Sequence, residues 1–346
     1  MKPTMDDIAQ RVGVSKSTVS LALNDKPGVS TELRQTIVEA AEELGYRLPD
    51  SRAVRRASPR KSITIVHCEG YGDTPSEELA ALYLEYIDGI NEFLSQMDVN
   101  LTLIAGHHDT SDQRQLGSRL LDSGRTSCDG YIVMGLGARR CSALIDQLQG
   151  EDVPIVVLSR QWPDVMVSTV SQDHRQQIKL VMDYLMRLGH RRIAFVAREE
   201  DRYYDWFEWR LEAFRQAMAQ LNGGMDDDLV SVGADGAVAV RTVLERCPDV
   251  TAVFGVNDGR AVEAMQGLSA LGLRIPHDVS VIGVDDTTRP PAPFPPLTTV
   301  TYPHAEMGFL AAELLLKQIE NRSILCTNMV VRSHLVERAS CARARS

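Results

Sequence analysis

The chain has 346 residues, 44% of them hydrophobic and 24% charged, a composition typical of a globular protein with room for two or three domains. Its longest apolar runs, such as Ile155–Leu158 and Ala252–Val256, are much shorter than a membrane span, and the polar start from Lys2 to Gln10 argues against a signal peptide. The six cysteines are scattered without a Cys-x-x-Cys pair, which favours reduced thiols over disulfides or zinc ligands. We therefore expect a cytoplasmic protein with no membrane partner.

The net charge of −10 argues against nucleic-acid binding when it is taken over the whole chain, but the charge is unevenly distributed. Residues 1–61 hold eleven Lys and Arg against eight Asp and Glu, a balance of +3, which leaves −13 for the rest. The segment Arg47–Lys61 has six basic residues opposed only by Asp50. A basic N-terminal module on an acidic body suits phosphate contact at one end, although charge alone slightly favours a plain solvated linker.

The first 45 residues predict three short helices. Thr4 precedes an apolar series at helical spacing, and Asp7 stands three residues later as its capping-box partner. Ser15 can cap a second helix and Ser30 a third, which ends at Gly45. Three helices in so few residues form a bundle that is too small to be an enzyme.

From Ser62 onward, apolar runs of strand length alternate with segments of helix length, such as Ser76–Met97 and Asp173–Leu188. This alternation predicts doubly wound parallel sheets, and about 280 residues of it favour two lobes over one. Ligands of such sheets bind beyond the carboxyl ends of the strands, which predicts a site between the lobes. The expected strands are Ile63–His67, Leu101–Ala105, Gly130–Met134, Ile155–Leu158, Ile193–Ala197, Leu229–Val232, Ala252–Val256 and Val279–Val284.

The segment Met5–Ser20 resembles the helix-turn-helix of the lactose/galactose repressor family. Its spacing supports the resemblance, because Gly13 suits the positive φ of a tight turn and Val19 faces inward. The resemblance implies that the second helix reads DNA bases in the major groove through Lys16, Ser17 and Leu21. It also implies contacts that fix the register on the DNA, mainly to phosphates, by Thr4, Ser15, Thr18, Ser20, Asn24 and Ser30.

The segment after the third helix departs from the family pattern. Members usually carry a proline soon after the tyrosine and then a leucine that wedges into the minor groove, but Pro49 comes one residue late here. Val54 is the only apolar candidate near the wedge position, so arginine insertion into a narrow minor groove is an alternative, and a plain linker is another. Leu21 also replaces an arginine of many members, so that this position either contacts a thymine methyl group or makes one fewer polar base contact. The candidate contacts of this segment are Arg52, Ala53, Val54, Arg55 and Arg56.

The resemblance extends to about Arg338, through matching segments that include Leu188–Phe195, Arg210–Phe214, Asn257–Ala261 and Ile275–Asp286. It implies a small all-α helix-turn-helix head plus an α/β sensor of two doubly wound, Rossmann-like lobes, like a type I periplasmic binding protein. The expected parts are a head at 1–46, a hinge at 47–61, a first lobe at 62–161 and 290–322, a second lobe at 162–289 and 323–338, and a disordered tail at 339–346.

The candidate effector-binding residues follow the expected strand ends. Asn257 and Asp285 can each engage neighbouring hydroxyl groups, and Arg210 offers a planar fork of donors. Asp258 is an equally good helix cap, and Ser159 stands where the family often has aspartate. The complete set of candidates is Arg210, Asn257, Asp285, Asp258, Tyr83, Ser159, Arg160 and Trp206.

These features predict a homodimeric transcriptional repressor that binds a pseudo-palindromic operator in double-stranded DNA and whose affinity is set by a carbohydrate-like effector between the lobes. A nucleobase or nucleoside corepressor is the alternative effector, and control by a protein partner without a ligand is a third route. We expect no cofactor and no metal.

An enzyme, or a sugar-binding module without operator binding, is the competing class of protein. Gly135-Leu136-Gly137 lacks the third glycine of a dinucleotide-binding loop, and phosphate-loop, Gly-x-Ser-x-Gly and His-Glu-x-x-His motifs are not present in the sequence. Because doubly wound sheets serve both classes, only these missing motifs favour a regulator over an enzyme.

Overall fold

The computed structural model divides the chain into two compact units, Met1–Arg60 and Lys61–Ser346. In the part of the chain that it describes, no helix is long and apolar enough to span a bilayer. The described residues are 4–23, 29–44, 46, 61–68, 77–106, 128–134, 142–150, 152–159 and 166–345.

The smaller unit contains the three expected helices, α1 (Met5–Val12), α2 (Lys16–Leu23) and α3 (Thr31–Glu43). They close over a core in which Ile8, Val19 and Ile37, one from each helix, are fully buried. Gly13 takes a φ of 74° between α1 and α2, as expected for the tight turn.

Polar caps fix the ends of these helices. The Asp7 carboxylate accepts hydrogen bonds from the backbone N–H and the hydroxyl of Thr4, and these bonds lower its pKa. The Ser15 hydroxyl accepts from the backbone N–H of Thr18, and Ser30 accepts from that of Leu33. The three caps expected from the sequence are therefore confirmed.

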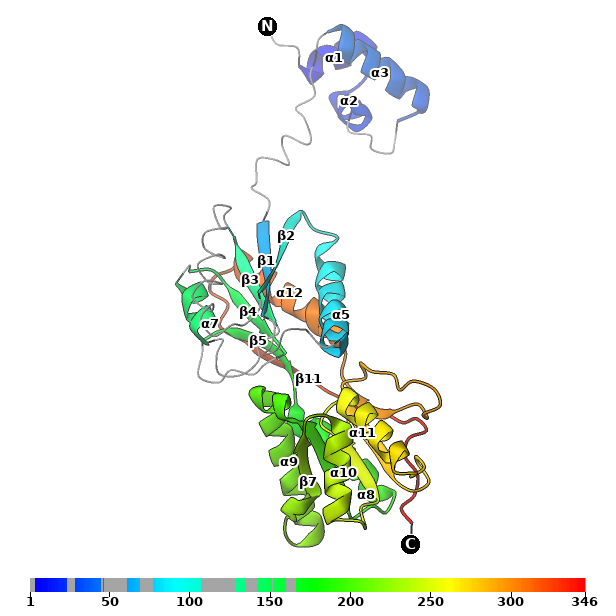
Figure 1. Ribbon diagram of the computed structural model, residues 1–346. Coiled ribbons are helices and arrows are strands. Elements are labelled where there is room, and N and C mark those ends of the chain that lie inside the picture. The colour runs from blue at the N-terminus through cyan, green and yellow to red at the C-terminus, as the bar shows by residue number, and fades with distance from the viewer. Residues whose placement is uncertain are drawn as a thin grey trace. The chain divides into compact units, whose positions relative to one another are not determined.

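The larger unit is built on two separate sheets, each of six strands in the described ranges (Figure 1). All eight strands expected from the apolar runs are present, within two residues at each end. The first lobe's sheet has the order β11-β5-β4-β3-β1-β2, with β1 (Lys61–Cys68), β2 (Val99–Gly106), β3 (Gly130–Met134), β4 (Ile155–Leu158), β5 (Ser168–Gln172) and β11 (Asn328–Val331). The second lobe's sheet has the order β12-β10-β9-β8-β6-β7, with β6 (Ile193–Arg198), β7 (Val230–Gly233), β8 (Ala252–Gly255), β9 (Ser280–Val284), β10 (Thr298–Thr301) and β12 (His334–Val336).

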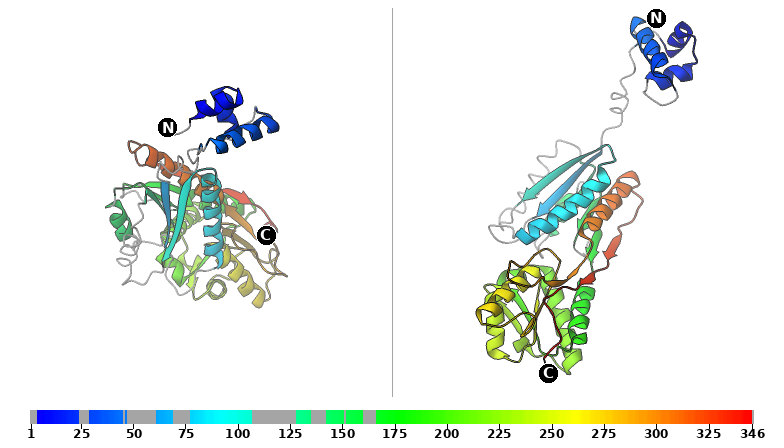
Figure 2. Two further views of the ribbon diagram at one scale, coloured as in Figure 1. Left: turned by 90° about the horizontal axis from the view of Figure 1, so that it is seen from above. Right: turned by 90° about the vertical axis from the view of Figure 1, so that its right-hand side faces the viewer.

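The two faces of the first sheet bury alternate residues of the same strands. Ile132 and Met134 of β3 face helices α5 (Glu77–Leu94) and α12 (His304–Glu320), whereas Tyr131 and Val133 face α7 (Ser142–Gln149). Helices α5 and α12 lie side by side on one face of this sheet (Figure 2).

Two glycines let α5 and α12 approach with backbone contact. A methyl group added at Gly89 would lie 1.7 Å from the carbonyl oxygen of Ala305, and one added at Gly308 would lie 2.0 Å from that of Tyr86. Only glycine fits at either crossing point, so these two positions set the spacing of the helices.

The second lobe carries α8 (His174–Arg187) packed against α9 (Asp205–Asn222), and α10 (Gly236–Arg246) packed against α11 (Asp258–Ala270). Two short 3-10 helices, η1 (Glu199–Tyr203) and η2 (Asp227–Leu229), precede α9 and β7. All strand neighbours in its sheet are parallel except β12, which is antiparallel to β10. The carboxyl ends of β6, β8 and β9 therefore meet along one edge.

The chain crosses between the lobes later than the boundaries expected at 161/162, 289/290 and 322/323. Strand β5 belongs to the first sheet, β10 to the second and β11 to the first, so the crossings follow residues 172, 301 and 331. Strands β5 and β10 are not predicted from the sequence, because their segments, Ser-Thr-Val-Ser-Gln and Thr-Thr-Val-Thr, are rich in hydroxyl side chains. Hydrogen bonds satisfy several of these groups when they are buried, as in the bond from the Thr299 hydroxyl to Asp258.

The expected disordered tail at 339–346 is instead packed on the second lobe as far as Arg345. Ser340 is fully buried, its carbonyl accepts from the backbone N–H of Val281 at 2.8 Å, and its hydroxyl accepts from that of Thr298 at 2.8 Å. The backbone N–H of Ala344 donates to the carbonyl of Leu188. These backbone contacts are not visible in a polar, arginine-rich sequence.

Candidate functional site

The candidate base-reading residues lie on α2, away from the core of the smaller unit. Lys16 and Ser17 are exposed and Leu21 is half-buried, while Val19 on the opposite side is fully buried. The Lys16 ammonium donates to Asp6 at 2.6 Å, and this hydrogen bond raises the pKa of the lysine. The helix therefore presents one cation and small hydroxyl groups to an incoming partner.

The remaining candidates for DNA contact divide into two groups. Thr4, Ser15 and Ser30 already serve as helix caps, and such residues can also offer their backbone N–H groups to a phosphate. Thr18 and Ser20 are half-buried on α2. The others lie outside the described residues, namely Asn24, Arg52, Ala53, Val54, Arg55 and Arg56.

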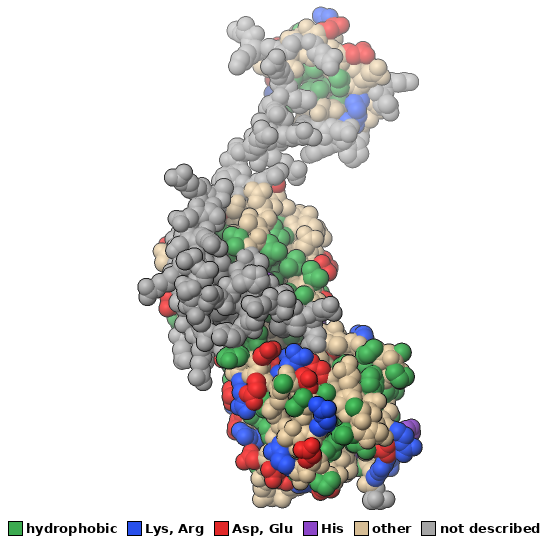
Figure 3. Space-filling model, viewed as in Figure 1, with side chains coloured by type: hydrophobic (Ala, Val, Ile, Leu, Met, Phe, Trp, Pro, Cys, Tyr) green, Lys and Arg blue, Asp and Glu red, His purple; other side chains and the backbone are tan. Residues whose placement is uncertain are grey.

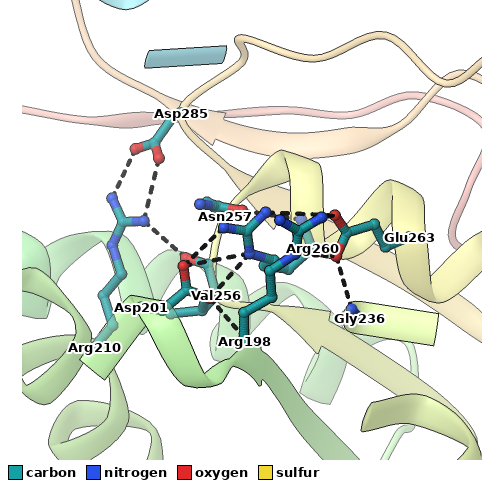
Figure 4. Close-up of polar contacts among 9 residues, drawn as sticks. All are labelled: Arg198, Asp201, Arg210, Gly236, Val256, Asn257, Arg260, Glu263 and Asp285. Carbon is teal, nitrogen blue, oxygen red and sulfur yellow. Dashed lines mark hydrogen bonds and ion pairs between the residues drawn. The ribbon is translucent and has the colours of Figure 1, made fainter. Parts of the chain in front are cut away.

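The second lobe brings Arg210 of α9 and Asp285, which follows β9, into a bidentate ion pair (Figure 4). Nη2 of Arg210 donates to Oδ1 of Asp285 at 2.6 Å, and Nη1 donates to Oδ2 at 3.2 Å. Nη1 also donates to the carbonyl oxygen of Val256 at 2.7 Å. The Arg210 side chain is 3% exposed and that of Asp285 is 15% exposed, so the pair is almost entirely removed from water.

This pair is held in place by its surroundings. Burial acts to lower the pKa of Arg210, but the adjacent charge of Asp285 acts to raise it. The net result is a raised pKa, so the arginine stays charged. Asp285 has a φ of 103°, a conformation that costs a non-glycine residue energy and is typical of functional turns. The guanidinium also lies 5.2 Å from the ring centre of Trp206, one helical turn earlier.

Two residues that the sequence analysis did not single out complete the surroundings of Arg210. Gln177 of α8 accepts from Arg210 Nη2 at 3.4 Å and from Nδ1 of His174 at 3.1 Å. The ring centres of His174 and Trp209 lie 5.3 Å apart, and the rings are tilted by 33°. Burial lowers the pKa of His174 to about 3, so the imidazole is neutral. Arg210 Nε and Gln177 Nε2 are buried donors that have no acceptor among the described residues. No local sequence pattern points to Gln177, because it lies on α8, 33 residues before Arg210 in the sequence.

Asn257 and Asp258 begin α11 directly after β8 and have different environments. The Asn257 side-chain oxygen accepts from the backbone N–H of Arg260 at 2.9 Å, which is a helix cap. Asp258 is fully buried and accepts from the hydroxyl of Thr299 at 2.6 Å and the backbone N–H of Thr287 at 3.0 Å. Burial raises the pKa of Asp258 well above its usual range. Asp258 therefore holds the loop after Asp285, while Asn257 stays half-buried.

The candidates on the first lobe are less closely connected to Arg210. The Tyr83 ring packs edge-on against His67 with 4.2 Å between the ring centres. Ser159 follows β4 with a φ of 68°, and its hydroxyl lies within 3.4 Å of the Gln172 amide. Arg160 lies outside the described residues.

The site has the character of a recognition site for polar groups. It combines a guanidinium, carboxylate and amide groups with an indole ring, and the charges of Arg210 and Asp285 cancel. Among the described residues, no group of three or more His, Cys, Asp or Glu side chains is placed to hold a metal ion. The face of the second lobe seen in Figure 3 mixes basic and acidic side chains, unlike the single-sign surface that binds phosphate backbones.

Comparisons with known families match both units. Residues 4–48 match the family described as bacterial regulatory proteins, lacI family, and residues 182–341 match a periplasmic binding protein-like domain. The HTH-type transcriptional regulator CelR of Thermobifida fusca is 31% identical over 347 residues, which cover 98% of each chain.

Solved structures give the same likeness. The transcriptional regulator CelR–cellobiose complex is similar with a TM-score of 0.69 and 29% identity, covering 98% of this chain and 99% of that one. The lac repressor dimer bound to operator and the anti-inducer ONPF has a TM-score of 0.67 with 22% identity, and covers 99% of this chain and 100% of that one. The second likeness concerns the fold alone.

Proposed function

The chain belongs to the lacI family of bacterial regulatory proteins, which are DNA-binding transcriptional regulators, and from this premise we propose that it is a repressor controlled by an uncharged carbohydrate. The carbohydrate binds beside Arg210 and Asp285 and changes the affinity of the helical head for its operator. The observation that carries this proposal is the buried bidentate ion pair beside two buried donors that find no acceptor within the described ranges of the chain.

The chemistry of the site favours a polyol. A buried charged pair binds vicinal hydroxyl groups well, because the carboxylate accepts from one hydroxyl and the guanidinium donates to its neighbour. Since Asp285 neutralises Arg210, a phosphate or carboxylate ligand would add an unbalanced charge to a buried site. The Trp206 ring offers an apolar face of the kind that packs against sugar C–H groups. The CelR–cellobiose complex supports the same class of ligand.

The head supports the DNA-binding half of the proposal. Its second helix exposes Lys16 and Ser17 and is held by a capped turn, which is the arrangement that places a recognition helix in the major groove. We propose that two copies of the chain bind a pseudo-palindromic operator as a homodimer, with one head on each half-site. The relatives are named as transcriptional regulators, and we extend this to propose that the chain has no enzymatic activity.

The test is a titration of the full-length protein with cellobiose, ribose, a nucleoside and a sugar phosphate, followed by thermal denaturation. We expect a neutral sugar to raise the melting temperature and Asp285→Asn to abolish that increase. Asp286→Asn is the matched control, because the neighbouring carboxylate pairs with Arg338 at 2.8 Å and not with Arg210.

The other outcomes distinguish the alternatives. Stabilisation by the nucleoside alone would indicate a nucleobase-type corepressor in place of a sugar. Stabilisation by the sugar phosphate alone would contradict the proposal that the ligand is uncharged. If Asp285→Asn and Asp286→Asn lose the increase in melting temperature equally, Arg210 and Asp285 are not part of the effector site. Turnover of a bound sugar would overturn the assignment as a regulator without enzymatic activity.

A further inference from the structure

Four charged side chains form a second, partly buried network next to the Arg210–Asp285 pair, with Arg260 and Asp201 at its buried centre (Figure 4). Arg260 donates to Asp201 through Nε and Nη2, each at 2.9 Å from a carboxylate oxygen. Nη1 of Arg260 lies 3.4 Å from Glu263, and Glu263 also pairs with Arg198. Two cations and two anions cancel, so the network is neutral as a whole.

The network joins the ends of three strands. Arg198 is the last residue of β6, and its backbone N–H donates to Asp201 at 2.7 Å, which fixes the start of η1. Glu263 of α11 accepts from the backbone N–H of Gly236, the first residue of α10 after β7, at 2.7 Å. Arg260 stands in the first turn of α11, after β8. The side chains therefore tie together segments that the backbone alone leaves independent.

These segments are the ones that carry the candidate effector residues. Asn257 caps α11 through the backbone N–H of Arg260, so the position of Arg260 fixes the position of Asn257. Asp201 lies in η1, and α9 with Trp206 and Arg210 begins two residues after η1 ends. The Arg260–Asp201 bond therefore links the two groups of candidate residues, in addition to the bond from Arg210 to the carbonyl oxygen of Val256.

The burial of this link is unusual for an arginine pair. The Arg260 side chain is 9% exposed and that of Asp201 is 2% exposed. By contrast, Arg192, which precedes the opposite end of β6, is 32% exposed and pairs with the exposed Asp226 and Asp249. A buried pair keeps one geometry because neither partner can turn to water, whereas an exposed pair exchanges with solvent.

We propose that Arg260 and Asp201 are positioning residues for the effector site: their ion pair sets the distance between Asn257 and the start of α9, and through it the affinity for the effector. Neither residue contacts the effector in this scheme. The inference rests on the proposed function, because it concerns the same site. It goes beyond that function because it makes the affinity for the effector depend on side chains that do not contact the effector.

The test uses Arg260→Lys, which keeps the charge but loses the two-point geometry, and Arg192→Gln as the control. Affinity for cellobiose is measured by calorimetry, and stability by thermal denaturation without ligand. We expect Arg260→Lys to weaken binding by at least tenfold and to lower the melting temperature more than Arg192→Gln, which should leave binding unchanged. Asp201→Asn combined with Arg260→Lys should weaken binding no further than either change alone, because the pair acts as a unit.

Cellobiose affinity that is unchanged in Arg260→Lys would overturn the inference and reduce the network to a stabilising one. If Arg260→Lys does not fold, Glu263→Gln changes the network at its edge, with the same expected direction and the same overturning result.

If the wild-type protein binds no sugar, the proposed function fails and the positioning role is judged without ligand. With Trp162 and Trp209 replaced by Phe, Trp206 is the only tryptophan left of three. Acrylamide should then quench its fluorescence more strongly in Arg260→Lys than in Arg192→Gln. Equal quenching in the two variants would overturn the positioning role.

Discussion

In the three-helix unit, the ion pairs Arg11–Glu43 and Lys16–Asp6 lie on the surface, with more than half of each side chain exposed. In the second lobe, Arg210–Asp285 and Arg260–Asp201 are buried and each is closed by two or more hydrogen bonds. Exposed charges remain free to exchange an internal partner for an external one, such as a phosphate. Buried charges hold one geometry, which is what the proposed effector site requires.

The comparison is tested most severely by removing one partner of each kind of pair. Asp285→Ala leaves the Arg210 cation buried without its partner, and we expect a loss of about 3–5 kcal/mol in the free energy of unfolding. Glu43→Ala removes an exposed pair of the head and should cost at most about 1 kcal/mol. Urea unfolding followed by tryptophan fluorescence measures the first change, because all three tryptophans lie in the larger unit.

The effect of Glu43→Ala on the head is measured by amide hydrogen exchange of α1 and α3. Similar losses for the two variants would show that burial does not distinguish these ion pairs, and the contrast between the units would then fail.

The pH dependence of stability should also differ between the two units. Burial lowers the pKa of His174 to about 3 in the folded protein, below its ordinary value near 6.5. As the pH falls below about 6.5, the unfolded chain takes up a proton that the folded chain refuses. The stability is therefore complete above pH 6.5 and decreases toward pH 3, by about 2 kcal/mol at pH 5 from this residue.

His174→Asn should remove that part of the difference between urea unfolding at pH 7 and at pH 5. Residues 1–60 contain no histidine, so the head should show no comparable loss over the same range. A pH dependence of the larger unit that is identical in wild type and His174→Asn would exclude His174 as its source.

The smallest effect on stability is expected at Lys16. Its pair with Asp6 is exposed, so Lys16→Gln should not change the unfolding of the protein measurably. Binding to DNA from upstream of its own gene should nevertheless weaken, and the slope of affinity against salt should fall by about one. Fluorescence anisotropy over a salt series measures both quantities.

Lys179→Gln is the control for this change, because Lys179 is also exposed and paired with an aspartate, but lies on α8 of the larger unit. An equal effect of the two variants on DNA affinity would show that net charge, and not the surface of α2, governs binding.

The sequence predicts features that depend on local patterns. Ser15 caps α2 and Gly13 takes a positive φ because both depend only on their neighbours along the chain. Strands with continuous apolar runs, such as Ile155–Leu158, are also predicted, since burial on both faces requires that composition. Polar strands such as Ser168–Gln172 are missed, because side chains such as those of Ser168 and Thr169 are satisfied by partners distant in the sequence.

The candidate site is predicted only in part for the same reason. Arg210 and Asp285 stand at matching motif positions, but their direct bond joins residues 75 positions apart. Asp201 lies outside the matching segments, and Arg260, although it lies within Asn257–Ala261, is a charged residue of the kind that is usually solvated. Their pairing depends on two strands lying next to each other, which only the assembled sheet provides.

The burial of Ser340 has a consequence for the order in which the parts of the protein can fold during synthesis. A ribosome releases the residues of the head first, and a three-helix unit with its own core can fold while the rest is still being synthesised. The second lobe must wait, because β9 and β10 each bond to Ser340, which is synthesised nearly 40 residues after the end of β10. During that interval, nascent chains would display a finished DNA-reading head on an unfinished sensor.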